Sequence, residues 1–184
     1  IIKLITRFMS KDIIVKRGLD LKLVGMPSLE VEEAKFSKDF SVYPEDFHGV
    51  YPKLVVKEND LVKSGDVLFY DKNSEKVKFV SPTSGRIKEI IRGERRKVIE
   101  IKIHADKDIA YKKIKKLKSE NPSEIIDFLL ENGLWTFIKQ RPYDVIADPE
   151  SNPKEIFISG FDSSPLSADY DFINNYKKEN IIEA

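Results

Sequence analysis

The sequence contains no cysteine among its 184 residues. This absence excludes disulfides, thiolate zinc sites, cysteine-ligated iron-sulfur clusters and a cysteine nucleophile, and it fits a reducing compartment. Histidine is almost as scarce, since His48 and His104 are the only two. His48 has no second histidine or spaced carboxylates nearby, as a metal site would need, and His104 ends an alternating run as an ordinary boundary residue. We therefore expect this chain to hold no metal.

Long apolar runs and an excess of charge of one sign are also missing. The most apolar window, residues 125–130, is far shorter than the roughly 20 residues that a membrane span needs. Lys and Arg total 32 against 31 Asp and Glu, whereas nucleic-acid binders usually show a basic excess. We predict a chain that folds in water, does not cross a bilayer on its own and has no nucleic-acid partner.

What the sequence does contain, from about residue 11 to 106, is a series of short β-branched runs separated by turn residues. The clearest runs are residues 77–80, 86–91 and 98–103. The last run alternates apolar and charged residues, which predicts one buried face with Glu100 and Lys102 facing water. Short, closely spaced strands predict a small barrel or sandwich, preceded by an N-terminal extension over residues 1–10.

The second half, residues 107–184, changes to a helical pattern. Asn121, Pro122 and Glu124 form a capping signal before an apolar stripe, and Gly133 is the expected left-handed terminator. A short buried strand over residues 155–159 and a helix over 169–178 are predicted next. Helix, strand and helix indicate the beginning of a Rossmann-like α/β domain. Too little sequence follows to complete its sheet, so we expect a truncated domain and a chain that is a fragment.

Residues 57–68 followed by residues 81–87 look like the lipoyl and biotinyl carrier fold, a flattened barrel of two interlocked halves. In true carriers the modified lysine sits at a hairpin tip after an acidic residue, and Asp71 and Lys72 stand near that place. The interval from Lys72 to Gly85 is longer than carriers usually allow, and Asn73 replaces their small residue. A solvated hairpin lysine is therefore the favoured interpretation, and a covalent carrier that uses Lys72 is the alternative.

A more specific resemblance runs through nearly the whole chain, from about residue 11 to the end. The order and spacing of several short motifs are similar to the A subunit of the bacterial sodium-translocating NADH:quinone reductase. These motifs are Arg17 to Pro27, the carrier-like stretch, Asn132 to Thr136, Gln140 to Tyr143, Asp148-Pro149 and Phe157 to Asp169.

This resemblance implies a lipoyl-like (barrel-sandwich hybrid) domain followed by an α/β domain, in a peripheral subunit on the cytoplasmic side of the bacterial inner membrane. It implies that the other subunits, chiefly a membrane subunit, are the partners. The complex as a whole uses flavins, an iron-sulfur centre, NADH and quinone, couples NADH oxidation and quinone reduction to sodium export, and is a translocase. Residues 159–162 lack the repeated glycines of a nucleotide loop, so we expect no cofactor bound by this chain, which alone is no complete enzyme.

Trp135, Arg141 and Tyr143 follow the capped helix within one short segment whose direction Pro142 restricts. They are the candidate contacts for a quinone or a neighbouring subunit. The alternative is structural, with Trp135 sealing the helix end and Arg141 binding its carbonyls or an acid. Five lysines between Lys112 and Lys118 could likewise approach anionic lipid headgroups, although a solvated linker is the simpler interpretation.

Overall fold

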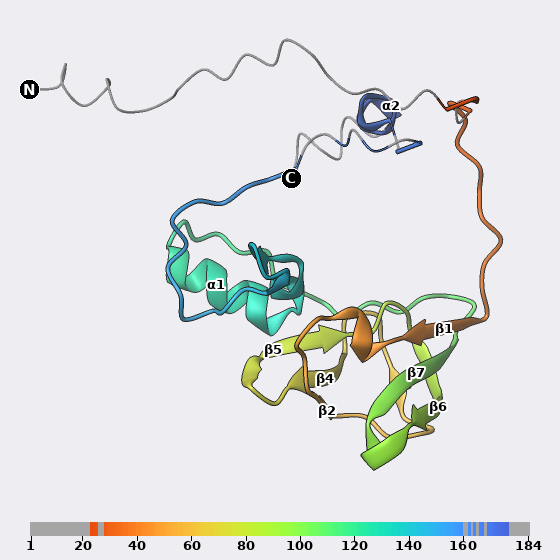
Figure 1. Cartoon of the computed structure of the whole chain (residues 1–184). Helices are drawn as coiled ribbons and strands as arrows, with labels where there is room; N and C mark the ends of the chain where they lie inside the picture. The colour runs from red at the N-terminus through yellow and green to blue at the C-terminus, as the bar shows by residue number, and fades with distance from the viewer. Residues whose placement is uncertain are drawn as a thin grey trace, which may run out of the picture. The chain divides into compact units, whose positions relative to one another are not determined.

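The computed structural model describes residues 23–25, 28–159, 162, 164, 166–167 and 169–176 (Figure 1). The predicted extension over residues 1–10 lies outside these residues, as does most of the Arg17 to Pro27 motif. The described part divides into one unit, Ala34–Lys154, and a second unit formed by the residues before and after it. The predicted boundary at residue 106 therefore falls inside the first unit.

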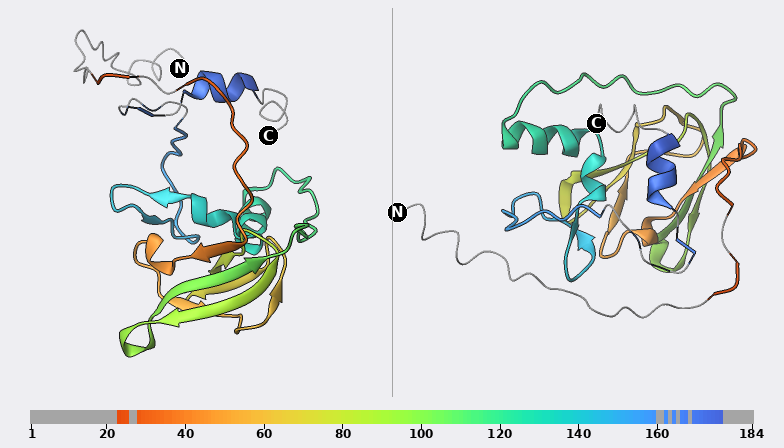
Figure 2. Two further views of the ribbon diagram at one scale, coloured as in Figure 1. Left: turned by 90° about the vertical axis from the view of Figure 1, so that its right-hand side faces the viewer. Right: turned by 90° about the horizontal axis from the view of Figure 1, so that it is seen from above.

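The first unit contains three antiparallel sheets, and the two larger ones lie face to face in the views of Figure 2. The larger sheet has the order β1-β7-β6-β3. Its strands span Asp39–Val42, Val98–Ala105, Gly85–Arg92 and Leu61–Val62. The smaller sheet has the order β2-β4-β5, with strands Pro52–Leu54, Val67–Asp71 and Ser74–Val80. The three strand runs predicted from the sequence are thus confirmed, and the expected β sandwich forms.

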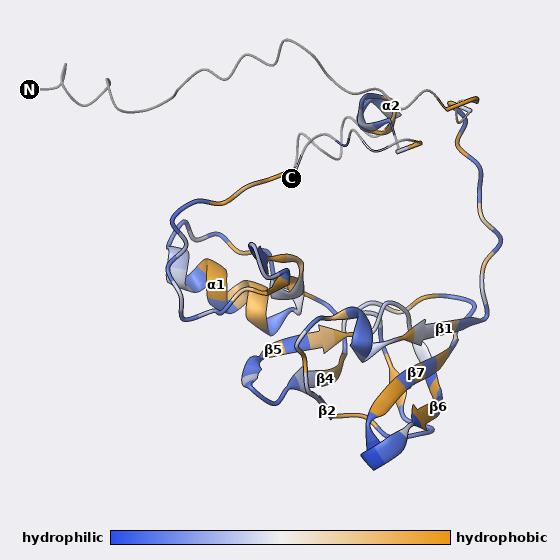
Figure 3. Ribbon diagram, in the orientation of Figure 1, coloured by the Kyte–Doolittle hydropathy of each residue, from blue (hydrophilic) through white to orange (hydrophobic). Residues whose placement is uncertain are grey.

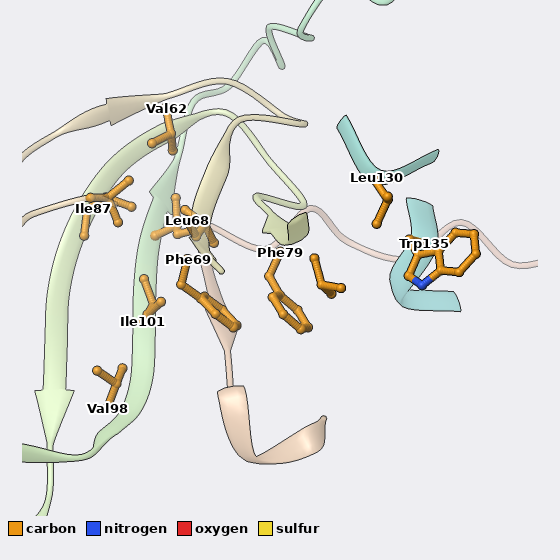
Figure 4. Close-up of a cluster of buried hydrophobic side chains, with 12 residues drawn as sticks. Val62, Leu68, Phe69, Phe79, Ile87, Val98, Ile101, Leu130 and Trp135 are labelled. Atoms are coloured by element: carbon orange, nitrogen blue, oxygen red, sulfur yellow. The ribbon is translucent and has the colours of Figure 1, made fainter. Parts of the chain in front are cut away.

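The core lies between these sheets and extends under the helical segment that follows (Figure 4). Phe69 and Phe79 stack with ring centroids 4.4 Å apart, and the edge of Phe47 meets Phe79 at 4.6 Å. Burying a side chain of this size stabilises the fold by about 1.5 to 3 kcal/mol. The buried apolar residues are Val56, Val62, Leu68, Phe69, Val77, Phe79, Ile87, Val98, Ile101, Ile103, Leu130 and Trp135.

Strand β7 shows the alternation expected of it with one correction. Ile101 and Ile103 are fully buried, as the period-two pattern requires. Glu100 was expected to face water, yet only 12% of its side chain is exposed. The Ser41 hydroxyl donates to its carboxylate at 2.6 Å and the Tyr43 hydroxyl at 3.1 Å. Strand β1 therefore covers Glu100, because it pairs with this edge of β7.

The turn before β6 is buried and polar. Ser81, Thr83 and Ser84 are each about 1% exposed, and their hydroxyls all donate hydrogen bonds within the fold. A Cβ on Gly85 would lie 2.0 Å from the His104 carbonyl oxygen, and its φ is +152°. Glycine is needed here because the backbones of β6 and β7 approach closely.

Helix α1 (Pro122–Glu131) begins and ends as predicted. The Asn121 side chain accepts a hydrogen bond from the Ser123 amide at 3.0 Å, and Gly133 has φ +70°. The reciprocal half of the capping box is not made by Glu124, because the Asn121 amide donates to the Ser119 hydroxyl instead. The apolar face of α1 packs on β5 (Figure 3).

The predicted strand over residues 155–159 is wrong. These residues form no strand, and Ile156, Phe157 and Ile158 are 77%, 85% and 91% exposed. An apolar run becomes a buried strand only where neighbouring strands and a covering layer accept it, and no such strands occur among the described residues beside it. The helix predicted after it is confirmed as α2 (Tyr170–Tyr176). Its predicted last residues, 177–178, lie outside the described part.

Candidate functional site

The candidate site is the corner that follows α1. It consists of the 3-10 helix η4 (Leu134–Phe137) and a small hairpin of β8 (Lys139–Gln140) and β9 (Val145–Ile146). Gly133 in its left-handed conformation turns the chain from α1 into η4, and its carbonyl accepts a hydrogen bond from the Thr136 hydroxyl at 3.0 Å. The backbone of this corner is thus fixed by local hydrogen bonds.

Trp135 belongs to the core of this corner. Only 8% of it is exposed, and it joins the same buried cluster as Leu130 and Phe79 (Figure 4). Its indole N–H donates to the Ala147 carbonyl at 2.8 Å, so the ring ties η4 to the chain after β9. A buried indole normally finds such an acceptor. Removing Trp135 would therefore cost core packing as well as any contact with a partner.

Arg141 and Tyr143 lie in the turn between β8 and β9 and face solvent. The Arg141 side chain is 79% exposed, with its nearest acid oxygen at 3.7 Å on Asp144, and Tyr143 is 70% exposed. Lys139 also approaches Asp144, at 3.5 Å. Arg141 thus pairs with an acid at long range and makes no hydrogen bond to the carbonyls of α1. The structure places the three predicted residues on one short segment, with Trp135 inside and the other two outside.

Phe137 is an exposed aromatic residue that the sequence analysis did not select. It is the last residue of η4, two residues before β8 begins, and is 82% exposed. Its position in an apolar run next to Trp135 is typical of a core residue, so the sequence offered no signal for its exposure. We call the three exposed side chains of this corner, Phe137, Arg141 and Tyr143, the corner face. Aromatic and arginine side chains are the types that dominate binding energy at interfaces.

A shallow cleft lies beside the corner, between the β4-β5 hairpin and the residues that follow β9. Lys76 and Glu150 form an ion pair across it, and the Glu150 carboxylate raises the pKa of Lys76. The lining residues are Asp71, Asn73, Ser74, Glu75, Lys76, Val77 and Ile146 to Glu150. The lining thus combines the charged residues of the hairpin with four apolar residues, Val77, Ile146, Ala147 and Pro149.

Lys72 lies where the sequence analysis expected it, at the tip of the β4-β5 hairpin, and is exposed. Its amide donates to the Tyr51 carbonyl at 2.9 Å, and Asp71 accepts from the Asn73 and Tyr51 amides at 3.1 Å each. The hairpin is therefore a tight two-residue turn pinned to the chain before β2. The side chain of Lys72 itself has no partner among the described residues.

Metal sites and membrane spans are the other kinds of feature that the described residues can reveal. Among the described residues there is no group of three or more His, Cys, Asp or Glu side chains that could hold a metal ion. His48 is exposed, and His104 lies 2.8 Å from Asp39. No helix in the described ranges is long and apolar enough to cross a membrane.

Comparison with known proteins assigns both halves of the chain to one family. Residues 13–106 match the NqrA N-terminal barrel-sandwich hybrid domain, and residues 120–184 match the NqrA second alpha/beta domain. These matches confirm the fold class predicted from the sequence.

Individual relatives give the same result. The chain is 37% identical to the A subunit of the Na(+)-translocating NADH-quinone reductase of Marinomonas sp. over 158 residues, which cover 84% of this chain and 36% of that protein. The corresponding protein of Pseudomonas aeruginosa is 37% identical over 159 residues with the same coverage, and that of Psychromonas ingrahamii is 34% identical over 171 residues, 91% of this chain and 38% of the relative. The chain thus spans little more than a third of the length of these relatives.

Proposed function

The chain belongs to the NqrA family, the A subunits of Na(+)-translocating NADH-quinone reductases, and on this premise we propose that it serves as the A subunit of such a reductase. The observation that carries the proposal is the match of two consecutive domains of one family, in the family's order, over residues 13–106 and 120–184. The reaction that we propose for the complete complex is the transfer of electrons from NADH to quinone, coupled to the movement of sodium ions out of the cell.

Within that complex we propose a structural and assembly role for this chain. Flavins, the iron-sulfur centre and the NADH site would belong to other subunits, and this chain would bind none of them. The scarcity of histidine and the absence of cysteine support this division, because they leave few of the usual ligands and nucleophiles.

We propose further that the chain is peripheral, on the cytoplasmic side, and docks against a membrane subunit near the place of quinone reduction. The corner face supports a docking role because Phe137, Arg141 and Tyr143 expose large side chains on a fixed backbone. A backbone that is already fixed loses little conformational entropy when a partner covers it. Direct contact of this face with quinone is the alternative role for the same residues.

A gene deletion tests the proposal as a whole. Membranes from cells that lack the gene for this chain should lose sodium-stimulated NADH:quinone reductase activity and sodium uptake into inverted vesicles. Supplying the gene again should restore both activities. Membranes that keep sodium-stimulated activity without the gene would refute the proposed function.

A further inference from the structure

The chain between β7 and α1 carries a concentration of positive charge that the proposed function does not use. Residues 111–118, which we call the lysine strap, contain Lys112, Lys113, Lys115, Lys116 and Lys118 and no acidic residue. Since the whole chain carries +1 and the strap carries +5, the remaining residues carry −4. The strap therefore accounts for the whole positive excess of this nearly neutral chain.

The strap is held at both ends and free between them (Figure 2). At its start the Lys112 amide donates to the Ser64 carbonyl at 2.8 Å, and the Ser64 amide donates to the Ala110 carbonyl at 2.9 Å. At its far end Asn121 caps α1. In the described structure no helix, strand or hydrogen bond involves residues 113–118. The first unit thus presents the strap at a defined place while leaving its backbone groups open to a ligand.

None of the five lysines is paired with an acid in the described part of the chain, although nine ion pairs occur elsewhere in it. Apolar residues recur at every third position between the lysines. Tyr111 is 68% exposed, Ile114 47% and Leu117 37%. In an extended chain with three residues per turn this spacing puts apolar side chains along one side. A surface that is both basic and apolar fits the boundary between lipid headgroups and acyl chains.

We propose that the lysine strap is a direct binding site for an anionic lipid bilayer. The lysine ammonium groups contact the headgroup phosphates, while Ile114 and Leu117 enter the headgroup boundary and the lysine stems lie beside them.

The composition of the strap favours lipid over nucleic acid. It has five lysines and no arginine, so it lacks the planar groups that read base edges and stack on bases. Its apolar residues are mainly aliphatic and offer little stacking surface to single strands, which bind on aromatic platforms. The lysine ammonium group is a compact charge that can contact a phosphate from many directions. It therefore suits lipid headgroups, whose positions in a fluid bilayer are not fixed.

The test uses the purified 184-residue chain and co-sedimentation with vesicles of phosphatidylcholine alone or of phosphatidylcholine mixed with phosphatidylglycerol. We expect binding to the mixed vesicles only, and a loss of binding as salt rises. The quadruple variant K112Q/K113Q/K115Q/K116Q should partition at least about tenfold less, because each lysine near an anionic surface contributes roughly fivefold. The variant I114S/L117S should lose the part of the binding that resists salt.

The matched control is K35Q/K57Q/K63Q/K154Q, which removes four exposed lysines outside the strap that form no ion pair in the described structure. It has the same net charge as the strap variant and should bind nearly as well as the parent chain. Equal loss in both variants, equal binding to both kinds of vesicle, or displacement from vesicles by single-stranded oligouridylate at equal charge would each overturn the proposal. The proposed function would survive any of these results, because the vesicles contain no other subunit.

Discussion

Two carboxylates attach the edge strand β1 to β7. Glu100 accepts hydrogen bonds from Ser41 and Tyr43, and these hydrogen bonds hold its pKa below the ordinary value of 4.5. Asp39 lies within hydrogen-bond distance of His104 and Lys88, which lower its pKa below 3.8 in the same way. Both groups therefore favour the folded state when they are ionised.

We expect acid to weaken this attachment first. A carboxylate whose folded-state pKa is lowered contributes stability above its unfolded pKa, and the contribution is lost as the pH falls through the lowered value. The urea midpoint of the parent chain should therefore fall more between neutral pH and about pH 3 than the midpoint of Glu100→Gln does. Glu75→Gln is the control, because its carboxylate is 72% exposed. Parallel pH curves for Glu100→Gln and the parent chain would refute the argument.

Gly133 should be far less replaceable than Lys72. A Cβ at Gly133 would lie 2.5 Å from a Val80 methyl and 3.2 Å from the Lys78 carbonyl, and φ is +70°. We expect Gly133→Val to lower the free energy of unfolding by about 2 kcal/mol or more, and Lys72→Ala by no more than about 0.5 kcal/mol. Thermal melts compare the two variants, and equal midpoints would show that the turn tolerates a side chain.

A helix or strand could be predicted from the sequence when the residues that determine it lie within a few positions of one another. Helix α1 was predictable because Asn121, Pro122 and Gly133 determine its ends through contacts within a few residues. The strand expected over residues 155–159 was not, because a strand requires partners that the same short segment cannot supply. The shielding of Glu100 was missed for a similar reason, since the strand that covers it lies about 60 residues earlier in the chain.

The candidate site was predictable only in part. The Trp-Arg-Tyr segment stands out in the sequence, but which of its side chains is buried depends on the turn that Gly133 makes and on the backbone after β9. Trp135 turned inward and Phe137 outward, although both are aromatic residues of the same apolar run. The contact of Trp135, Arg141 and Tyr143 with quinone or a neighbouring subunit stays a prediction.

The corner face can be tested through its hairpin. Arg141→Ala should lower quinone reductase activity or subunit retention in the assembled complex. Truncating an arginine at the centre of an interface often weakens the binding free energy by about 2 kcal/mol or more. The melting temperature of the isolated chain should hardly change, since the Arg141 side chain is 79% exposed and its acid partner lies at 3.7 Å. Arg92→Ala, on an exposed residue at the end of β6, is the control for activity. If Arg141→Ala lowers the melting temperature of the isolated chain while the complex keeps full activity, the role of the corner is structural.

For the molecule as a whole, we expect the purified chain to be colourless. It has no cysteine for a cluster, and its two histidines are not placed as a haem pair along the sequence. The absorbance of gel-filtered protein, measured at rising concentration above about 350 nm, checks this prediction. Flavins and haems absorb in that range. A visible band that scales with protein would show that the chain holds a cofactor.

The carrier alternative is also a property of the whole molecule and can be measured by intact mass. Expression together with a lipoylating or a biotinylating ligase should leave the mass of the chain unchanged, because the turn at Lys72 departs from the carrier pattern at Asn73. A known carrier domain expressed in the same cells is the positive control. Stoichiometric modification that disappears in Lys72→Ala would establish the carrier function instead.

The pairing of β1 with β7 sets the order of events while the chain is being synthesised. Asp39 pairs with His104 and Val42 with Ile101, so β1 leaves the ribosome about 60 residues before its partner does. At about 5 to 20 residues per second, β1 waits roughly 3 to 12 seconds without a neighbour. The β4-β5 hairpin can form in that interval, yet the face of β5 that packs on α1 and η4 stays uncovered until these helices follow. Nascent chains of this protein therefore expose the edge of β1 until β7 has emerged, and one face of β5 until the helical corner has emerged.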